Sequence, residues 1–147
     1  MGKGTIQTRE STNTSTVKMI TLIDIPKITD FRGNLGVIEK EVIPFSIKRV
    51  YYLYDVPSTA YRGGHSHIDQ TELLIPLSGS FEVILDNGKE KNLVFLNKPD
   101  KGLLINKGIW RELQNFSSGA VCLVLSSGEF DEADYIRSYN DFVASKS

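Results

Sequence analysis

Short β-forming segments separated by turn residues limit most strongly what this chain can fold into. Between residues 17 and 126, segments rich in Val, Ile, Leu and Tyr alternate with clusters of Gly, Asp, Asn and Pro. Many short strands at such spacing are typical of an all-β sandwich or barrel. We therefore expect strands over residues 19–25, 35–39, 46–54, 72–77, 81–85, 91–96, 102–105, 110–115 and 120–126.

Turn chemistry marks where these strands reverse direction. The sequence Asp86-Asn87-Gly88 separates two of the strands and predicts a β-hairpin, because such residues readily adopt the positive φ of tight turns. Residues 30–34 predict a second turn, and residues 57–64 predict a loop that precedes the two histidines.

The two ends of the chain differ from its middle. Residues 1–16 are polar and lack a periodic apolar face, so we expect a flexible tail there. Residues 17–147 are expected to form a single domain, since a chain of 147 residues is long enough for only one core. Residues 130–142 combine acids near their start with spaced aromatic residues, which predicts a short C-terminal amphipathic helix.

Charge and cysteine content exclude several classes of protein. With 17 Lys and Arg against 18 Asp and Glu, the chain has no overall positive field to hold nucleic acid or an anionic membrane surface. No apolar stretch reaches the ~20 residues of a membrane-spanning helix, so we expect a cytoplasmic protein. The single cysteine, Cys122, excludes a disulfide within one chain and is expected to be a buried strand residue.

The only two histidines, His65 and His67, stand two positions apart. Side chains at this spacing on a strand point to the same face, so inside a barrel both imidazoles would share one cavity. There they could bind a metal ion or transfer a proton near neutral pH. If the segment is instead an exposed loop, both rings are merely solvated.

A histidine pair, a glutamate and a glycine have a spacing that resembles the first motif of the cupin superfamily: His65, His67, Glu72 and Gly79. That resemblance implies a metal held by these side chains in a small β-barrel, with a further histidine from a second motif. Arg111 stands at the position of that histidine. A guanidinium repels a divalent cation, cannot become a ligand and keeps neighbouring imidazoles neutral. This departure favours proton transfer over metal binding.

Four segments resemble the signature blocks of the dTDP-sugar 3,4-ketoisomerases, the WxcM-like cupins: residues 43–52, 62–67, 108–112 and 131–139. The resemblance implies a cupin-type β-barrel, or jelly roll, and a homodimer. It also implies conversion of dTDP-4-keto-6-deoxyglucose into its 3-keto isomer without a metal. Such a reaction belongs to the biosynthesis of deoxyamino sugars for surface polysaccharides.

Two residues depart from the pattern of that family. Ile68 stands where family members usually carry Lys, and Glu72 stands where they carry an amide. The carboxylate of Glu72 could complete a metal site with the histidines, or orient a histidine tautomer through a hydrogen bond. It could also lie on the surface at the start of a strand.

Interconverting a 4-keto and a 3-keto sugar requires removal of the C3 proton, an enediol and return of a proton to C4. The reaction needs a neutral base, a donor near the developing enediolate oxygen and a shuttle, but no redox cofactor or metal. The resemblance assigns His65 as the base, His67 as its neighbour and shuttle, and Tyr51 as the donor. Since Tyr51 and Tyr52 alternate on a strand, only one of them can face inward.

Arginines suit the diphosphate of such a substrate, because a guanidinium pairs with phosphate oxygens through two parallel hydrogen bonds. Arg62, directly before the histidines, is the strongest candidate, while Arg32 and Arg111 are weaker ones. Arg32 and Arg111 also lie where family members differ, so we expect them to influence which face of C4 is reprotonated. Glu72 completes the expected substrate contacts. The residues leave the gluco and galacto configurations of the product both open.

Two other functions fit some of these residues. A metal-binding cupin enzyme would hold Fe, Mn or Zn with His65, His67 and Glu72. A non-catalytic module that binds a nucleotide sugar has little need of two neutral histidines, which argues against that alternative.

Overall fold

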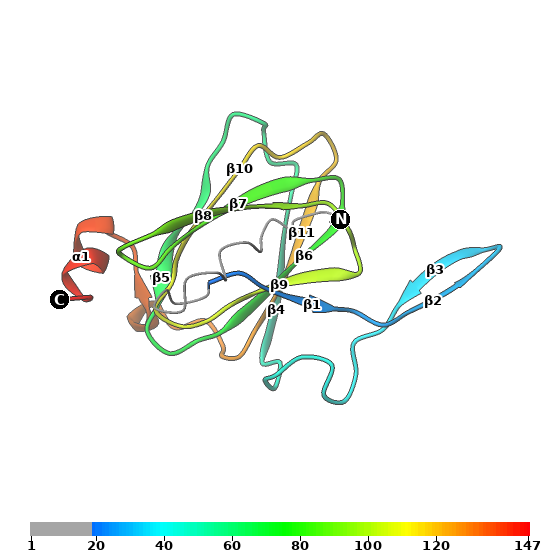
Figure 1. Ribbon diagram of the computed structural model, residues 1–147, viewed down its shortest axis with the longest axis horizontal. Coiled ribbons are helices and arrows are strands. Elements are labelled where there is room, and N and C mark those ends of the chain that lie inside the picture. The colour runs from blue at the N-terminus through cyan, green and yellow to red at the C-terminus, as the bar shows by residue number, and fades with distance from the viewer. Residues whose placement is uncertain (1–18) are drawn as a thin grey trace.

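The computed structural model describes residues 19–147, which form two five-stranded antiparallel sheets and a small hairpin (Figure 1). The tail expected over residues 1–16 lies outside the described residues. In spatial order, the first sheet contains β1 (Thr21–Asp24), β9 (Lys101–Ile105), β6 (Glu72–Ser78), β11 (Val121–Ser126) and β4 (Arg49–Tyr54). The second sheet contains β12 (Tyr135–Ile136), β5 (Arg62–His67), β10 (Trp110–Gln114), β7 (Phe81–Asp86) and β8 (Lys91–Leu96).

The two sheets pack on each other through the side chains that alternate onto their inner faces. Leu74 on β6 and Val124 on β11 are partners in the first sheet, and both join one buried cluster with Phe81 of the second sheet. Each buried side chain of this size stabilises the fold by about 1.5–3 kcal/mol. Cys122 is completely buried in the same cluster, as expected, and burial raises the pKa of its thiol.

The all-β jelly-roll expectation is confirmed for the described residues, which contain one short α-helix beside the strands. The two sheets are hydrogen-bonded separately, so they do not close into one continuous barrel. The hairpin of β7 and β8 is also confirmed. Its last ladder pair joins Asp86 to Lys91, and Asp86 Oδ1 accepts a hydrogen bond from the backbone N–H of Gly88 at 2.7 Å.

A second hairpin, β2 (Lys27–Asp30) and β3 (Gly33–Gly36), projects away from the sheets (Figure 1). The sequence predicted a turn over residues 30–34 and a strand over residues 35–39, and it missed β2. All four residues of β2 are exposed, so this strand lacks the apolar alternation by which strands are recognised. Phe31, at the tip of the hairpin, is 97% exposed.

The strand that carries both histidines begins earlier than expected. β5 starts at Arg62, so the loop predicted over residues 57–64 is wrong for its last three positions. Gly63 has a φ of 77°, and the register of β5 against β10 shifts between Arg111 and Leu113. A bulge of this kind bends the strand and changes the direction of neighbouring side chains. The glycine therefore marks a bulge beside the histidines rather than a turn.

The C-terminal segment differs from the helix predicted over residues 130–142. It forms a 3-10 turn η2 (Glu132–Asp134), the short strand β12, and α1 (Tyr139–Ala144). β12 pairs with β5, and this tertiary contact overrides the local helical pattern. The helix begins only after Ser138, whose hydroxyl caps its first turn. Among the described residues, no helix has both the length and the apolar character needed to cross a membrane.

Candidate active site

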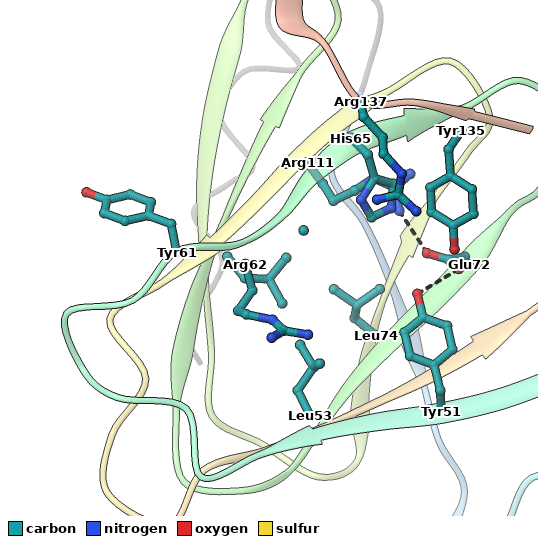
Figure 2. A pocket seen from close by; sticks show the side chains of 13 residues that line it. Tyr51, Leu53, Tyr61, Arg62, His65, Glu72, Leu74, Arg111, Tyr135 and Arg137 are labelled. Atoms are coloured by element: carbon teal, nitrogen blue, oxygen red, sulfur yellow. Dashed lines mark hydrogen bonds and ion pairs between the residues drawn. The ribbon is translucent and has the colours of Figure 1, made fainter. Parts of the chain in front are cut away.

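A cavity of about 400 Å³ lies among β4, β5, β6, β10 and β12 (Figure 2). This volume is typical of sites for small molecules. The ionisable side chains that line it are Tyr51, Tyr61, Arg62, His65, Glu72, Arg111, Tyr135 and Arg137. The fold therefore brings most of the residues expected from the sequence to one cavity.

His65 lies on β5 with its imidazole at the wall of the cavity, and only 9% of the residue is exposed. Burial lowers the pKa of His65 to about 3, and the positive charge of Arg111 and the neighbouring His67 add to this effect. The imidazole is therefore neutral at physiological pH. A neutral imidazole beside a cavity can accept a proton from a bound molecule.

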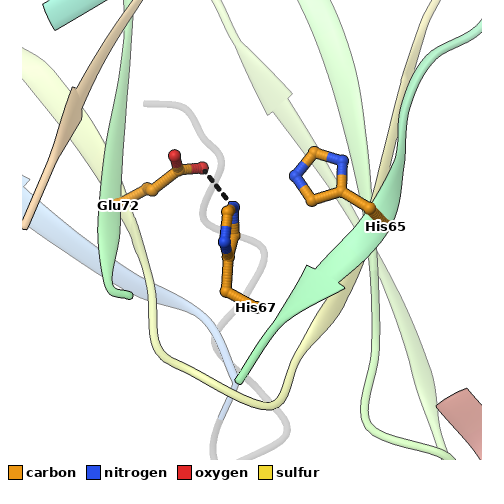
Figure 3. A group of neighbouring side chains, drawn as sticks. All are labelled: His65, His67 and Glu72. Atoms are coloured by element: carbon orange, nitrogen blue, oxygen red, sulfur yellow. Dashed lines mark ion pairs between the residues drawn. The ribbon is translucent and has the colours of Figure 1, made fainter. Parts of the chain in front are cut away.

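His67 lies deeper, with no exposed surface, and is not among the residues that line the cavity. The two imidazole centroids are 4.9 Å apart and the rings are nearly perpendicular, which confirms that both side chains turn to one side of β5 (Figure 3). Nδ1 of His67 is 2.9 Å from Oδ2 of Asp134, and Nε2 is 3.5 Å from Oε1 of Glu72. His67 therefore contacts buried carboxylates.

Glu72 opens β6 and connects most of the polar groups in the site. Its side chain is 1% exposed, so the surface position considered above is wrong. Oε1 accepts a hydrogen bond from Nη1 of Arg111 at 2.9 Å, and Oε2 accepts one from the Tyr51 hydroxyl at 2.9 Å. Burial raises the pKa of Glu72, but the contacts with His67, Arg111 and Tyr51 outweigh burial and lower it to about 2. Glu72 is therefore a carboxylate.

Tyr51 is the aromatic residue of β4 that faces the cavity, whereas Tyr52 is 59% exposed. The alternation expected for this pair is therefore confirmed. Burial raises the pKa of Tyr51, as do the charge of Glu72 and its hydrogen bond with the phenol. The guanidinium carbon of Arg49 lies 5.0 Å from the centre of the Tyr51 ring. The phenol is therefore protonated and held in place at the edge of the cavity.

The three arginines singled out in the sequence lie in different environments. Arg62 is exposed and extends into the cavity (Figure 2). Arg111 is almost completely buried, and its Nη2 donates to the carbonyl of Ile109 at 3.2 Å. Arg32 does not line this cavity: it lies at the tip of the β2–β3 hairpin and pairs with Asp30 at 2.7 Å.

The sequence reasoning missed three residues that complete the site, all from the C-terminal segment. Tyr135 packs its ring on both histidines, with centroid distances of 4.9 Å to His65 and 4.4 Å to His67. Arg137 lines the cavity and lies over the Tyr135 ring at 4.2 Å. Asp134 is buried against His67. The helix predicted over residues 130–142 assigned these three residues no role, although residues 131–139 form one of the four blocks that resemble the family.

The residues do not fit a metal ion. Donor atoms of His65, His67 and Glu72 lie within 4.8 Å of one another, a spacing that could hold a cation. However, Arg111 donates a hydrogen bond to the Glu72 oxygen that is nearest to His67, so its permanent positive charge would lie beside the ion. Asp134 holds Nδ1 of His67, so Nε2 is the ring atom left for an ion, and it faces the carboxylate oxygen that Arg111 already binds. The positive charge of Arg111 already balances the Glu72 carboxylate, and this arrangement disfavours metal coordination.

A jelly roll with a neutral imidazole, a phenol and arginines around one cavity is suited to acid–base chemistry on a small anionic molecule. The chain belongs to the WxcM-like family, because the family model described as "FdtA: WxcM-like, C-terminal" matches residues 18–147. A curated relative from Aneurinibacillus thermoaerophilus, TDP-4-oxo-6-deoxy-alpha-D-glucose-3,4-oxoisomerase, is 44% identical over 122 residues. The match covers 82% of this chain and 88% of that protein.

Solved structures of 3,4-ketoisomerases are also similar to this chain. The sugar 3,4-ketoisomerase QdtA from Thermoanaerobacterium thermosaccharolyticum, in complex with TDP, is 41% identical with a TM-score of 0.86. The alignment covers 89% of this chain and 96% of QdtA. The TDP-quinovose 3,4-ketoisomerase WlaRB from Campylobacter jejuni is 43% identical with a TM-score of 0.82, covering 87% of this chain and 99% of WlaRB.

Proposed function

We propose that this chain is a 3,4-ketoisomerase that converts dTDP-4-keto-6-deoxyglucose into its 3-keto isomer. The observation that carries the proposal is the neutral imidazole of His65 on the wall of a cavity, next to the phenol of Tyr51. The names of the relatives support the substrate class, since they include enzymes of TDP-linked 4-oxo-6-deoxy sugars. A mutant of QdtA in complex with TDP-4-keto-6-deoxyglucose supports it further.

The proposed chemistry is two coupled proton transfers. His65 takes the proton from C3 and later delivers to C4 either that proton or one exchanged with water while the enediol is bound, so one imidazole serves both carbon atoms. The Tyr51 hydroxyl turns from Glu72 toward the sugar, donates its proton to the oxygen on C4 as the enediol forms, and regains a proton from the oxygen on C3 as the new carbonyl forms. One proton thus moves between the carbons and one between the oxygens, and no electrons leave the sugar.

The charged residues around the cavity are proposed to bind and orient the substrate. Arg62 is positioned for the diphosphate, because it is exposed at the cavity and suited to bidentate phosphate contacts. Arg111 and Glu72 lie nearer the sugar, where the guanidinium can stabilise developing charge on the enediolate oxygen. His67 contacts Glu72 without lining the cavity, so any proton that it exchanges with the substrate passes through the Glu72 carboxylate.

We further propose that the enzyme is a cytoplasmic homodimer. Apolar side chains are exposed on the β2–β3 hairpin and on the outer face of β4: Ile28, Phe31, Leu35, Val50, Tyr52 and Tyr54. A second copy of the chain would remove this surface from water. Arg32 lies on the same hairpin, so a role in substrate binding requires that the hairpin of one copy reach the cavity of the other. Light scattering after size exclusion tests this, and a purely monomeric protein would contradict it.

Purified protein mixed with dTDP-4-keto-6-deoxyglucose tests the activity directly. We expect NMR of the reaction mixture to show consumption of the 4-keto sugar and appearance of a 3-keto isomer, without added metal or nicotinamide. Binding of TDP by titration calorimetry, measured in parallel, separates the alternatives. Tight binding of the nucleotide sugar without any conversion would identify a binding module and overturn the proposal.

A further inference from the structure

A buried carboxylate outside the cavity holds one of the histidines. Asp134 lies at the end of η2 and is 6% exposed, and it does not line the cavity. Its oxygens accept hydrogen bonds from the backbone N–H groups of Asp69 at 2.6 Å and Gln70 at 3.3 Å. The same carboxylate lies 2.9 Å from Nδ1 of His67. The C-terminal segment thus places one carboxylate against two backbone N–H groups and Nδ1 of His67.

These backbone contacts fix which atom of the His67–Asp134 pair donates. Oδ1 accepts from the Asp69 amide and Oδ2 from the Gln70 amide, so both oxygens already act as acceptors. Nδ1 of His67 is therefore the donor in its contact with Oδ2. With the Nδ1 proton fixed, only Nε2 can gain or lose a proton without breaking this contact.

The other ring nitrogen of His67 connects this residue to a side chain that lines the cavity. Nε2 is buried, has no hydrogen-bond partner among the described residues, and points toward Oε1 of Glu72 at 3.5 Å. Oε2 of that carboxylate accepts the hydroxyl proton of Tyr51, whose phenol lines the cavity. A continuous series of contacts therefore runs from Asp134 through His67 and Glu72 to Tyr51.

We propose that Asp134 is a positioning residue for the isomerase reaction, which acts by holding His67 with Nδ1 protonated and Nε2 directed at Glu72. This inference rests on the proposed function. The neutral ring then presents its Nε2 lone pair to Glu72 and cannot hold that carboxylate by a hydrogen bond. The fixed ring instead forms the surface on which His65 rests, since the two rings meet edge to face, so Asp134 acts on the reaction by holding the proposed base in place.

Histidine NMR tests the first half of the proposal in the native protein. The chain has only two histidines, so long-range proton–nitrogen correlation gives two ring systems, and His65→Asn assigns them. We expect Nδ1 of His67 to carry a proton in the wild type. In Asp134→Asn the amide can donate to the ring, so we expect Nδ1 to lose its proton and Nε2 to gain one. A wild-type His67 with an unprotonated Nδ1 overturns the proposal.

Kinetics test whether Asp134 affects the isomerase reaction. We expect Asp134→Asn to lower kcat by about 10- to 100-fold, as is typical when a group that orients a functional histidine is changed, with KM and TDP affinity altered by less than about twofold. Asp131→Asn is the matched control, because Asp131 lies in the same segment, is exposed, and only caps the Ala133 amide. The control should retain both kcat and the tautomer.

The two measurements together leave no ambiguous result. Unchanged kcat in a folded Asp134→Asn overturns the positioning role, as does a lower kcat with an unchanged tautomer. If the variant fails to fold, the wild-type tautomer still decides whether Asp134 holds Nδ1 as described. If the wild type has no isomerase activity, the proposed function fails, whereas a protonated Nδ1 would still support the geometric claim about His67.

Discussion

Nη1 of Arg111 lies 2.9 Å from Oε1 of Glu72, and both side chains are almost completely buried. The pair links β10 to β6 across the cavity. It also accounts for two properties of the site at once, since the guanidinium helps to keep His65 neutral and binds a carboxylate oxygen that a metal ion would need.

Breaking this pair should destabilise the protein strongly. Arg111→Met leaves the Glu72 carboxylate buried without its main partner, and we expect the free energy of unfolding to fall by about 3–5 kcal/mol. Adding Glu72→Gln removes the uncompensated charge and should restore part of that loss. Arg62→Met, at an exposed position, is the control and should change stability by less than about 0.5 kcal/mol. Urea denaturation measures all four proteins, and a loss below about 1 kcal/mol for Arg111→Met would contradict this interpretation.

Removal of metal ions should leave the isomerase activity unchanged. Arg111 already donates to the Glu72 oxygen that faces His67, and its permanent positive charge would lie beside a cation, so we expect the same kcat before and after dialysis against a chelator. Added Zn²⁺ or Mn²⁺ should not increase the rate. Metal analysis of the purified protein provides the second measurement. Loss of turnover on chelation, restored by one metal, would show that the site coordinates an ion.

His65→Asn should separate binding from catalysis. The asparagine keeps a polar side chain on the cavity wall but cannot take up the C3 proton, so we expect kcat to fall by about 10²- to 10⁴-fold. TDP affinity should stay within about threefold of the wild type, because Arg62 and Arg137 remain in the cavity. Calorimetry and a turnover assay on the same preparation measure both. Equal losses of affinity and turnover would be inconsistent with a base.

The stability of the protein should depend on pH through His65. Its pKa is about 3 in the folded chain and ~6.5 when unfolded, so between these values only the unfolded chain takes up the proton. The free energy of unfolding should therefore fall as pH decreases from ~6.5, by up to ~1.4 kcal/mol per pH unit. The carboxylate of Glu72 adds a further loss only below its unfolded pKa of ~4.3, as the pH approaches its folded pKa of about 2.

The pH range between 6.5 and 5 separates the contribution of His65 from that of Glu72. In this range His65→Asn should abolish the contribution of His65 and flatten the decline of stability, whereas Glu72→Gln should not remove that contribution. Urea denaturation at several pH values checks both variants. A wild-type stability that does not change over this range, or an identical slope in His65→Asn, would show that His65 is not held neutral by the fold.

Much of the site can be predicted from the sequence by short-range rules of strand and turn geometry. Two histidines two positions apart must share a face of a strand, and Tyr51 and Tyr52 must point to opposite faces. The structure confirms both relationships. The β7–β8 hairpin likewise depends only on residues next to one another in the chain. Such features can be predicted because the partners that determine them are local.

The rest of the site depends on contacts between distant parts of the chain. β12 is a strand only because it pairs with β5, so its sequence alone indicated a helix. Asp134 meets His67 across 67 positions of sequence, and Glu72 meets Arg111 across 39. β2 was not predicted from the sequence because all its side chains are exposed and it has no apolar face. Tertiary pairing, rather than local propensity, decides these cases.

Incubation with dTDP-4-keto-6-deoxyglucose in deuterium oxide tests the central claim most directly. If a single neutral imidazole removes the C3 proton and delivers a proton to C4, NMR should show deuterium entering C4 of the product and C3 of recovered substrate. His65→Asn should suppress both exchanges. Exchange or conversion that persists undiminished in His65→Asn would contradict the assignment of His65 as the base.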